Sequence, residues 1–438
     1  MRNFMTNIWN DNRGNAMIIA AAALPLLIGS AGLATDTIQW ALWKRQLQRA
    51  ADSAAIAGVY DRIAAKSTTG TAAAVDKDLG LNNSLDSTDF PLQTKTVTFP
   101  ADDVSNKLKN QVKVELAVRR PLSFSSMFMA NAPLIKTAAT AAAVSSEGEF
   151  CVLSLQNNSK TGIQATGNAT ITMDCGMMTN STSTNAAAGQ GSSLVTATML
   201  AASGGIQESR NWTLSEGYAP YSPALEDPYA DLTPDSTDSH NNCLVNKGAI
   251  TGSNGSGTNF TEGCFSGINI GSNKSATLAP GVYFINGGSV NIQGTLNARD
   301  GVTIILGNTN PSATATIGSF DMNANGQMNI EAPKTGKWAG MAVYQDRRAV
   351  DNAPTGNITA SSPNKINGNS TNKIRGIVYF PNQQLTYNGD GTGSATCTQF
   401  VSKRIYWSGN SGINNFTKNC EPFGISAIKT GLRVRLVA

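Results

Sequence analysis

The chain has 438 residues, a formal net charge of +4, and only 14% charged residues. Apolar residues make up 40% of the chain, with 42 glycines in addition, which is ordinary for a globular protein and argues against disorder throughout. The basic residues form no stripe interleaved with aromatic rings, and the single histidine and the missing Cys-x-x-Cys motif leave no zinc site to propose. We therefore expect no nucleic acid partner and no cofactor.

The first predicted element is a membrane anchor. Residues 14–35 form a run of 22 uncharged residues, and about 20 apolar residues in a helix span a bilayer. Gly32-Leu33-Ala34 is similar to a signal-peptide cleavage site, which is the alternative interpretation. Because the apolar run exceeds the roughly 7–15 residues of a signal-peptide core, we favour a retained anchor. Residues 1–14 then form a cytoplasmic tail and residues 15–35 the transmembrane anchor.

The charges that flank the span give only a weak indication of its orientation. Arg2 and Arg13 precede the span, whereas Lys44, Arg45 and Arg49 follow it. By the positive-inside rule, this distribution leans slightly against export of the C-terminal region.

The cysteines are more informative about orientation. All six follow the span and fall into three local pairs with spacings of 24, 21 and 23 residues. An even number in local pairs suggests disulfides and an oxidising compartment, although six buried free thiols in a cytosolic protein are the alternative. The disulfide candidates are Cys151, Cys175, Cys243, Cys264, Cys397 and Cys420.

The next module is predicted to cover residues 36–146. The helix continues past Asp36 with a stripe of small residues, which we expect to pack on partner subunits. Trp40 and Trp43 lie about one turn beyond the apolar core, either at the membrane interface or in a protein core. Residues 94–99 and 111–118 alternate as strands do, and residues 135–144 are assigned as a strand in preference to a helix. A helix laid against a small sheet is a pilin-like α+β plan, by analogy only.

The largest module is predicted to cover residues 147–438. Short apolar alternations recur between Gly and Asn residues, at intervals of about 8–14 residues within 268–330. This pattern favours a parallel β-helix-like solenoid over a β-sandwich, and stacked Asn and Thr rows would explain the low charge. The fold class is therefore mainly β, with the helix and the small pilin-like module first.

Several segments resemble a known family. The N-terminal segments are residues 13–20, 23–26, 32–36 and 47–57, and the later ones are residues 227–232, 278–285, 340–347 and 376–381. Together they resemble TadG-like proteins of the Flp/Tad (tight adherence) pilus system, more specifically at the N-terminus than in the β-rich part. The resemblance implies a membrane-anchored component of bacterial pilus or adhesion machinery.

Two features of that family do not carry over. Related pseudopilins have a Glu shortly after the Arg-Gly pair, whereas Met17-Ile18-Ile19-Ala20 has none, which puts prepilin-peptidase processing in doubt. Some relatives have a metal site built on Asp-x-Ser-x-Ser, and the sequence after Asp52 does not continue that pattern.

Catalytic and calcium sites are the remaining chemical hypotheses. An acidic stretch near His240 could bind Ca²⁺, but its spacing fits no EF-hand and its Pro and Ser/Thr residues indicate a solvated loop; its members are Glu226, Asp227, Asp231, Asp235 and Asp238. Asp300 and Asp346, each beside an arginine, could serve a polysaccharide-degrading β-helix enzyme, but we interpret both as corner salt bridges. His240 is interpreted as an exposed loop residue.

The sequence thus predicts a non-enzymatic protein of the inner membrane, with a single span and its C-terminal domain in the periplasm or cell envelope. Its expected role is in assembly or anchoring of a Flp-type pilus, with other pilus-assembly proteins or pilin-like subunits as partners. The alternative is an adhesin that binds surface glycans, and a polysaccharide-degrading enzyme is the third hypothesis.

Overall fold

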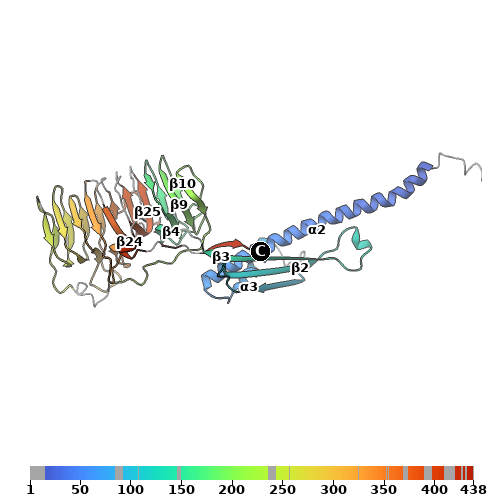
Figure 1. Ribbon diagram of the computed structural model, residues 1–438, viewed down its shortest axis with the longest axis horizontal. Coiled ribbons are helices and arrows are strands. Elements are labelled where there is room, and N and C mark those ends of the chain that lie inside the picture. The colour runs from blue at the N-terminus through green and yellow to red at the C-terminus, as the bar shows by residue number, and fades with distance from the viewer. Residues whose placement is uncertain are drawn as a thin grey trace, which may run out of the picture. The chain divides into compact units, whose positions relative to one another are not determined.

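The structure is a computed structural model that divides the chain into two compact units, which are described separately (Figure 1). The first unit combines residues 1–145 with 432–438, and the second covers 146–431. The residues described are 15–83, 92–106, 108–145, 149–234, 243–255, 257–323, 325–351, 353, 355–367, 373–388, 397–408, 420–425, 428–429 and 432–437. The predicted cytoplasmic tail, residues 1–14, lies outside them.

One long helix begins the first unit. Helix α2 (Asn15–Ala65) has 51 residues and includes Pro25, and α3 (Thr71–Asn83) follows it. A proline inside a helix removes one hydrogen-bond donor, which apolar membrane helices tolerate. Between the two helices, Lys66 and Gly70 adopt positive φ angles of 50° and 93°, a backbone conformation that cannot continue a helix.

An antiparallel sheet completes the first unit. Its strands lie in the order β1 (Thr94–Thr98), β2 (Leu108–Arg119), β3 (Leu134–Ser145) and β27 (Leu432–Leu436). The three strands predicted near residues 94–99, 111–118 and 135–144 are confirmed. The 3-10 helix η1 (Ser125–Met127) lies in the loop between β2 and β3.

The second half of α2 packs on this sheet. Its buried side chains include those of Leu47, Ala50, Ala51, Ala54 and Ala55. They form one apolar core with buried valines of β2 and alanines of β3. At Gly58 an added Cβ would lie 2.9 Å from the Val112 side chain, so the small residues permit a close helix–sheet approach. The small-residue stripe is thus covered by the chain's own sheet, and the expectation that it packs on partner subunits is wrong.

The last strand changes the predicted boundary between the modules. We expected residues 147–438 to form one β-helix-like domain, but β27 pairs with β3, from Leu432 opposite Ser145 to Leu436 opposite Ala141. Alternate apolar residues at the very end of the chain extend the sheet of the first unit. The second unit is therefore inserted between β3 and β27.

The second unit consists of short strands with bounds as follows. In chain order they are β4 (Glu149–Ser154), β5 (Ile163–Ala165), β6 (Thr170–Thr172), β7 (Gly176–Thr179), β8 (Ala187–Gly189), β9 (Leu194–Ala202), β10 (Trp212–Ala219), β11 (Ala249–Thr251), β12 (Thr258–Phe260), β13 (Gly263–Phe265), β14 (Gly267–Ile270), β15 (Ser275–Leu278), β16 (Gly281–Asn286), β17 (Val290–Ile292), β18 (Thr295–Ala298), β19 (Val302–Gly307), β20 (Phe320–Met322), β21 (Gln327–Glu331), β22 (Met341–Gln345), β23 (Lys365–Ile366), β24 (Lys373–Asn388), β25 (Thr398–Ser408) and β26 (Ile428–Lys429). The 3-10 helix η2 (Glu421–Phe423) precedes β26.

These strands form parallel columns, as in a β-helix-like domain. Ile268 pairs with Val290, Ala276 with Leu296, and Phe284 with Ile305. Each partner lies one coil further along the chain, and each pairing is parallel, unlike the antiparallel sheets of a β-sandwich. The β-sandwich alternative is therefore not supported.

The coils are not stacked in sequence order. Strand β25 pairs with β4 and β5 on one side and with β24 on the other, all parallel. The last coil of the unit thus lies against its first coil, in the middle of the stack. In Figure 1 the red strands β24 and β25 lie between the orange strands and the green strands β4, β9 and β10. We call this junction of β25 with β4 and β5 the seam.

One column of parallel strands has both of its faces buried, and we call it the doubly covered column. Inward side chains such as Ile304, Val343 and Val378 form the core of the stack. On the outer face, an apolar row runs along successive strands and includes Phe284, Tyr344, Tyr379, Val401 and Leu153, in that spatial order; the outer row is buried as well. This explains why β7, β19 and β22 are buried along their whole length, as parallel strands covered on both faces are.

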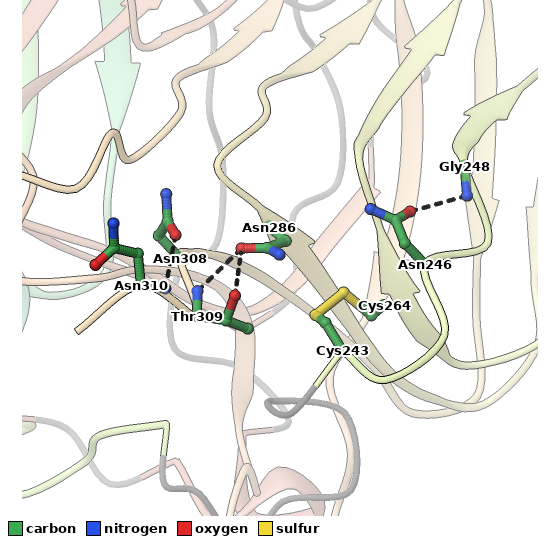
Figure 2. The surroundings of a disulfide bond; sticks show 8 residues. All are labelled: Cys243, Asn246, Gly248, Cys264, Asn286, Asn308, Thr309 and Asn310. Atoms are coloured by element: carbon green, nitrogen blue, oxygen red, sulfur yellow. Dashed lines mark hydrogen bonds between the residues drawn. A yellow bond between two sulfur atoms is a disulfide. The ribbon is translucent and has the colours of Figure 1, made fainter. Parts of the chain in front are cut away.

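Asparagine side chains satisfy the backbone at the corners of the coils. Asn286 Oδ1 accepts hydrogen bonds from the backbone N–H of Thr309, at 2.9 Å, and from its hydroxyl, which links adjacent coils (Figure 2). Asn308 Oδ1 accepts from the N–H of Asn310, also at 2.9 Å, within one turn. Uncharged polar side chains thus satisfy the backbone at these corners, which accounts for the low content of charged residues.

One charged side chain is buried in the stack near the seam. Arg404 of β25 has 0% of its surface exposed, and its guanidinium pairs with Asp351. Lys403 Nζ lies 2.8 Å from the same carboxylate. Burial alone would raise the pKa of Asp351, but hydrogen bonds from Arg404 and Lys403 prevail and lower it to about 2.

Replacing Asp351 with Ala should destabilise the second unit. Removing one partner of a buried ion pair leaves the other charge uncompensated, at a cost of about 3–5 kcal/mol. Acid should act in the same direction: since the folded pKa lies below the ordinary value, the ion pair stabilises fully above about pH 5, and this stabilisation is lost as the pH falls towards 2. Thermal unfolding of wild type and variant between pH 7 and pH 3 measures both effects.

The matched control is Glu331→Gln, because Glu331 pairs with the more exposed Arg375 at 3.4 Å. An exposed pair contributes about 0–1 kcal/mol. Equal destabilisation by Asp351→Ala and by the control, or an equal pH dependence of wild type and Asp351→Ala, would contradict the prediction.

Candidate functional site: the anchor helix and the segments that fix it

The N-terminal half of α2 is apolar and uncovered. The helix is long and apolar enough to cross a membrane, with a mean hydropathy of 2.0 over its most apolar window. Its exposed large apolar side chains are Ile18, Ile19, Leu24, Leu26, Leu27, Ile28, Leu33, Ile38, Trp40 and Leu42. At about 1.5 Å per residue, residues 15–35 extend about 32 Å, close to the thickness of the hydrocarbon core.

A loop covers the first charged residue after this run. Asp36 is only 3% exposed, because the loop between β2 and β3 lies against it. Its carboxylate accepts hydrogen bonds from the N–H of Phe124, at 2.9 Å, and from the N–H and hydroxyl of Ser125. The Ser123 hydroxyl donates to Gln39 Oε1 at 3.1 Å, one turn further along α2. The carboxylate is therefore satisfied although it is withdrawn from water.

Gly32 lets this loop reach the helix. An added Cβ at Gly32 would lie 2.3 Å from ring carbons of Phe124, so only glycine leaves room for the ring. The loop is therefore fixed at two neighbouring turns of α2, by packing at Gly32 and by hydrogen bonds at Asp36.

The two tryptophans of α2 lie beyond Asp36 next to cationic side chains. Lys44 Nζ lies 5.1 Å from the centre of the Trp40 ring, and Arg120 lies 5.1 Å from that of Trp43. Trp40 is exposed, whereas Trp43 is partly buried and packs against the core of the first unit. Of the two interpretations, a core role holds in part for Trp43, and a surface position holds for Trp40.

The six cysteines form the three local pairs that their spacing indicates. The disulfides are Cys151–Cys175, Cys243–Cys264 and Cys397–Cys420, with Cα–Cα distances of 5.9, 5.3 and 4.9 Å. One cysteine of each pair lies in or directly beside a strand of the doubly covered column, namely β4, β13 or β25. Cys243–Cys264 lies at one end of that column, on the outermost strand β13 (Figure 2).

In the second unit, another covering segment crosses the seam. We call residues 222–234 the strap. It begins at β9, where the N–H of Ser222 donates to the carbonyl of Ala202, and passes Asn180, which exchanges two hydrogen bonds with Leu225. It then reaches β25, β24 and β22 through hydrogen bonds to Gln399, Tyr379 and Tyr344; the strap residues that make them are Tyr229, Asp227 and Leu232.

The acidic stretch predicted as a solvated loop belongs partly to this strap. Asp227 accepts hydrogen bonds from the Tyr379 hydroxyl and from Arg347, the latter at 3.1 Å. Burial and the bond to Asp227 raise the pKa of Tyr379, so it donates as a neutral phenol. Asp227 is thus a structural residue, which corrects the solvated-loop interpretation for this part. Asp235, Asp238 and His240 lie outside the described residues.

The two candidate catalytic aspartates are in different surroundings. Asp346 pairs with Arg348 at 2.7 Å, as the corner salt bridge predicts. Asp300 adopts a positive φ of 69° in a turn and makes no ion pair with any described residue, so the salt-bridge expectation is wrong there. Within the described part of the chain, no three His, Cys, Asp or Glu side chains gather as metal ligands would.

The loop contact with Asp36 and the course of the strap were not evident from the sequence. A lone carboxylate at the end of an apolar run was the available signal for the first. For the strap, the signal was the Asp-Pro-Tyr segment itself, whose partners lie more than 100 residues away in the chain.

Non-reducing peptide mapping of protein from the cell envelope should recover each of the three pairs as a linked peptide. A disulfide that closes a loop of this length contributes about 3 kcal/mol in the chain-entropy model, so reduction should lower the unfolding temperature. Alkylation of unreduced, denatured protein is the control, and it should label no cysteine. Six alkylated cysteines would contradict both the pairing and the oxidising compartment.

Comparison with known proteins gives a family match for helix α2. No curated protein and no solved structure matches the chain. Residues 14–66 match the family model described as putative Flp pilus-assembly TadE/G-like. The match covers the whole of α2, that is, both the uncovered apolar half and the half that packs on the sheet. The resemblance of this N-terminal segment to the TadE/G-like proteins of the Flp pilus is thereby confirmed.

Proposed function

We propose that this protein is a membrane-anchored, non-enzymatic component that assembles or anchors a Flp/Tad-type pilus. It crosses the inner membrane once through residues 15–35, with residues 1–14 in the cytoplasm. The pilin-like first unit and the β-solenoid of the second unit lie on the periplasmic side. Other pilus-assembly proteins or pilin-like subunits are the expected partners.

The observation that carries this proposal is the difference in surroundings between the two halves of α2. One unbroken helix matches the pilus-assembly family, exposes apolar side chains up to Leu42, and buries its later side chains from Leu47 onward in the core of the first unit. Such a helix attaches the folded unit directly to the bilayer. Its continuity supports a retained anchor, because cleavage after Ala34 would remove Gly32, against which Phe124 packs.

The disulfides support the orientation. Three pairs within one unit need an oxidising compartment to form and persist, which the periplasm offers and the cytoplasm does not. This argument outweighs the weak positive-inside signal, because the numbers of basic residues on the two sides of the span differ by only one.

Two of the carboxylates considered above, one as a catalytic and one as a calcium-binding candidate, support a non-enzymatic role. Asp346 and Asp227 are engaged by Arg348 and Arg347, within hydrogen-bond networks that hold the coils and the strap. A general acid or base has to be available to a substrate, and these side chains already serve the fold.

Protease treatment of spheroplasts should digest the chain beyond about residue 36. The cytoplasmic and membrane-embedded residues before it should be protected by the bilayer. An antibody tag at the C-terminus reports the digestion, and a cytoplasmic protein serves as the control for intact membranes. Protection of the C-terminal tag, or a mature N-terminus near Thr35, would contradict the proposed topology.

Deleting residues 16–34 should abolish pilus-dependent attachment of cells to a surface, because the unanchored protein cannot hold the assembly at the membrane. Asp300→Asn is the matched control: it changes an exposed turn and should leave attachment unchanged. Loss of attachment in an abundant, folded Asp300→Asn variant would argue for enzymatic function instead, and attachment by the deletion variant would refute anchoring as the role.

A further inference from the structure

Three consecutive exposed apolar side chains lie in the loop between β2 and β3. Met127 and Phe128 are each 75% exposed and Met129 is 51% exposed. Phe128 also contacts Phe124, with a ring-centre distance of 5.3 Å. Single apolar residues on a protein surface are ordinary, but a contiguous apolar group marks an interaction site.

The position of this group along α2 is fixed by the contacts of the loop. Phe124 packs on Gly32, and the amides of Phe124 and Ser125 bind Asp36. Since residues 15–35 account for the hydrocarbon thickness, Asp36 lies at its boundary and Gly32 about 6 Å inside it. The exposed side chains that follow Ser125 are therefore held at the depth of the lipid interface.

The charges around the loop fit the same placement. The carboxylate of Asp36 would be costly next to acyl chains, and the loop supplies its hydrogen-bond donors. Arg119, at the end of β2, donates to the carbonyl of Ala132 at 2.8 Å and so closes the base of the loop. Arg120 lies over Trp43, about 10 Å beyond Asp36 along the helix, where the headgroups of the bilayer begin.

We propose that the loop of residues 121–133 inserts into the periplasmic leaflet of the membrane that α2 spans. Met127, Phe128 and Met129 enter the boundary between headgroups and acyl chains, and the ligand is the phospholipid bilayer itself. This inference rests on the proposed anchoring. It gives the first unit a second membrane contact beside α2, which restrains the tilt and the depth of the unit relative to the membrane plane.

Site-specific photo-crosslinking tests this insertion in the full-length protein. A diazirine amino acid is placed at position 128, at position 26 within the span, or at position 104. Val104 is the matched control, since it is also exposed, at 89%, but lies in the turn at the opposite end of β2. The protein is reconstituted in vesicles of phosphatidylethanolamine and phosphatidylglycerol and irradiated, and lipid adducts are measured by mass spectrometry.

We expect lipid adducts at positions 26 and 128 and at least tenfold fewer at position 104. Adducts at 26 without adducts at 128 would overturn the inserted loop while leaving the anchor intact. If position 128 instead crosslinks to a pilus protein in native membranes and never to lipid, the exposed group is a protein interface and the proposal is wrong. The absence of adducts at 26 would overturn the anchoring and the insertion together.

A second variant tests how the loop is held. Asp36→Ala removes the acceptor for the amides of Phe124 and Ser125, so the lipid adduct at position 128 should fall several-fold while that at position 26 is unchanged. Asp103→Ala is the control, because Asp103 accepts the N–H of Asn106, at 3.0 Å, in the opposite loop. An unchanged yield in Asp36→Ala would overturn the role of Asp36 in holding the loop at the interface.

Discussion

One unbroken helix has an uncovered apolar half and a half that is buried on a sheet, and the rest of the first unit follows from this constraint. Up to Leu42, α2 presents large apolar side chains to its surroundings, whereas from Leu47 to Gly58 it presents small residues to a sheet. No turn or break separates the two halves, so the change from exposed apolar side chains to packing on the sheet occurs within a few turns. Asp36 lies where this change begins, and the loop that covers Asp36 supplies hydrogen-bond donors to its carboxylate.

In the second unit, the corresponding constraint is that the first and last coils have to be paired and the outer apolar face of the stacked strands has to be covered. The seam brings the last coil against the first, and the strap and the segment around Phe423 cover the outer apolar row. Arg404 and Asp351 are placed next to this junction, so electrostatic pairing and backbone pairing stabilise the same region. The disulfides then attach neighbouring segments to the doubly covered column.

The sequence predicted those features that depend on short-range patterns. Alternation identified β1 and β2, the recurrence of short strands identified the parallel coils, and spacing identified the cysteine pairs. Features that join distant segments could not be read in this way. The pairing of β25 with β4 joins Val401 to Leu153, and β27 joins Leu432 to Ser145, although local sequence marks no strand as the partner of another. The small-residue stripe was recognised, but its partner was misassigned, because alanines that pack on a partner subunit look the same as those that pack on the chain's own sheet.

The seam also has a consequence for the order in which the strands of the second unit can pair. Strand β4 emerges early during synthesis, but its neighbour β25 begins at Thr398, with more than 200 residues between them. At about 5–20 residues per second, this edge stays unpaired for tens of seconds. An open parallel edge is a template for wrong pairing, so a newly made molecule is exposed to mispairing during this interval. A product that stops before Thr398 would lack both this partner and β27, so a shortened chain leaves both units unfinished at once.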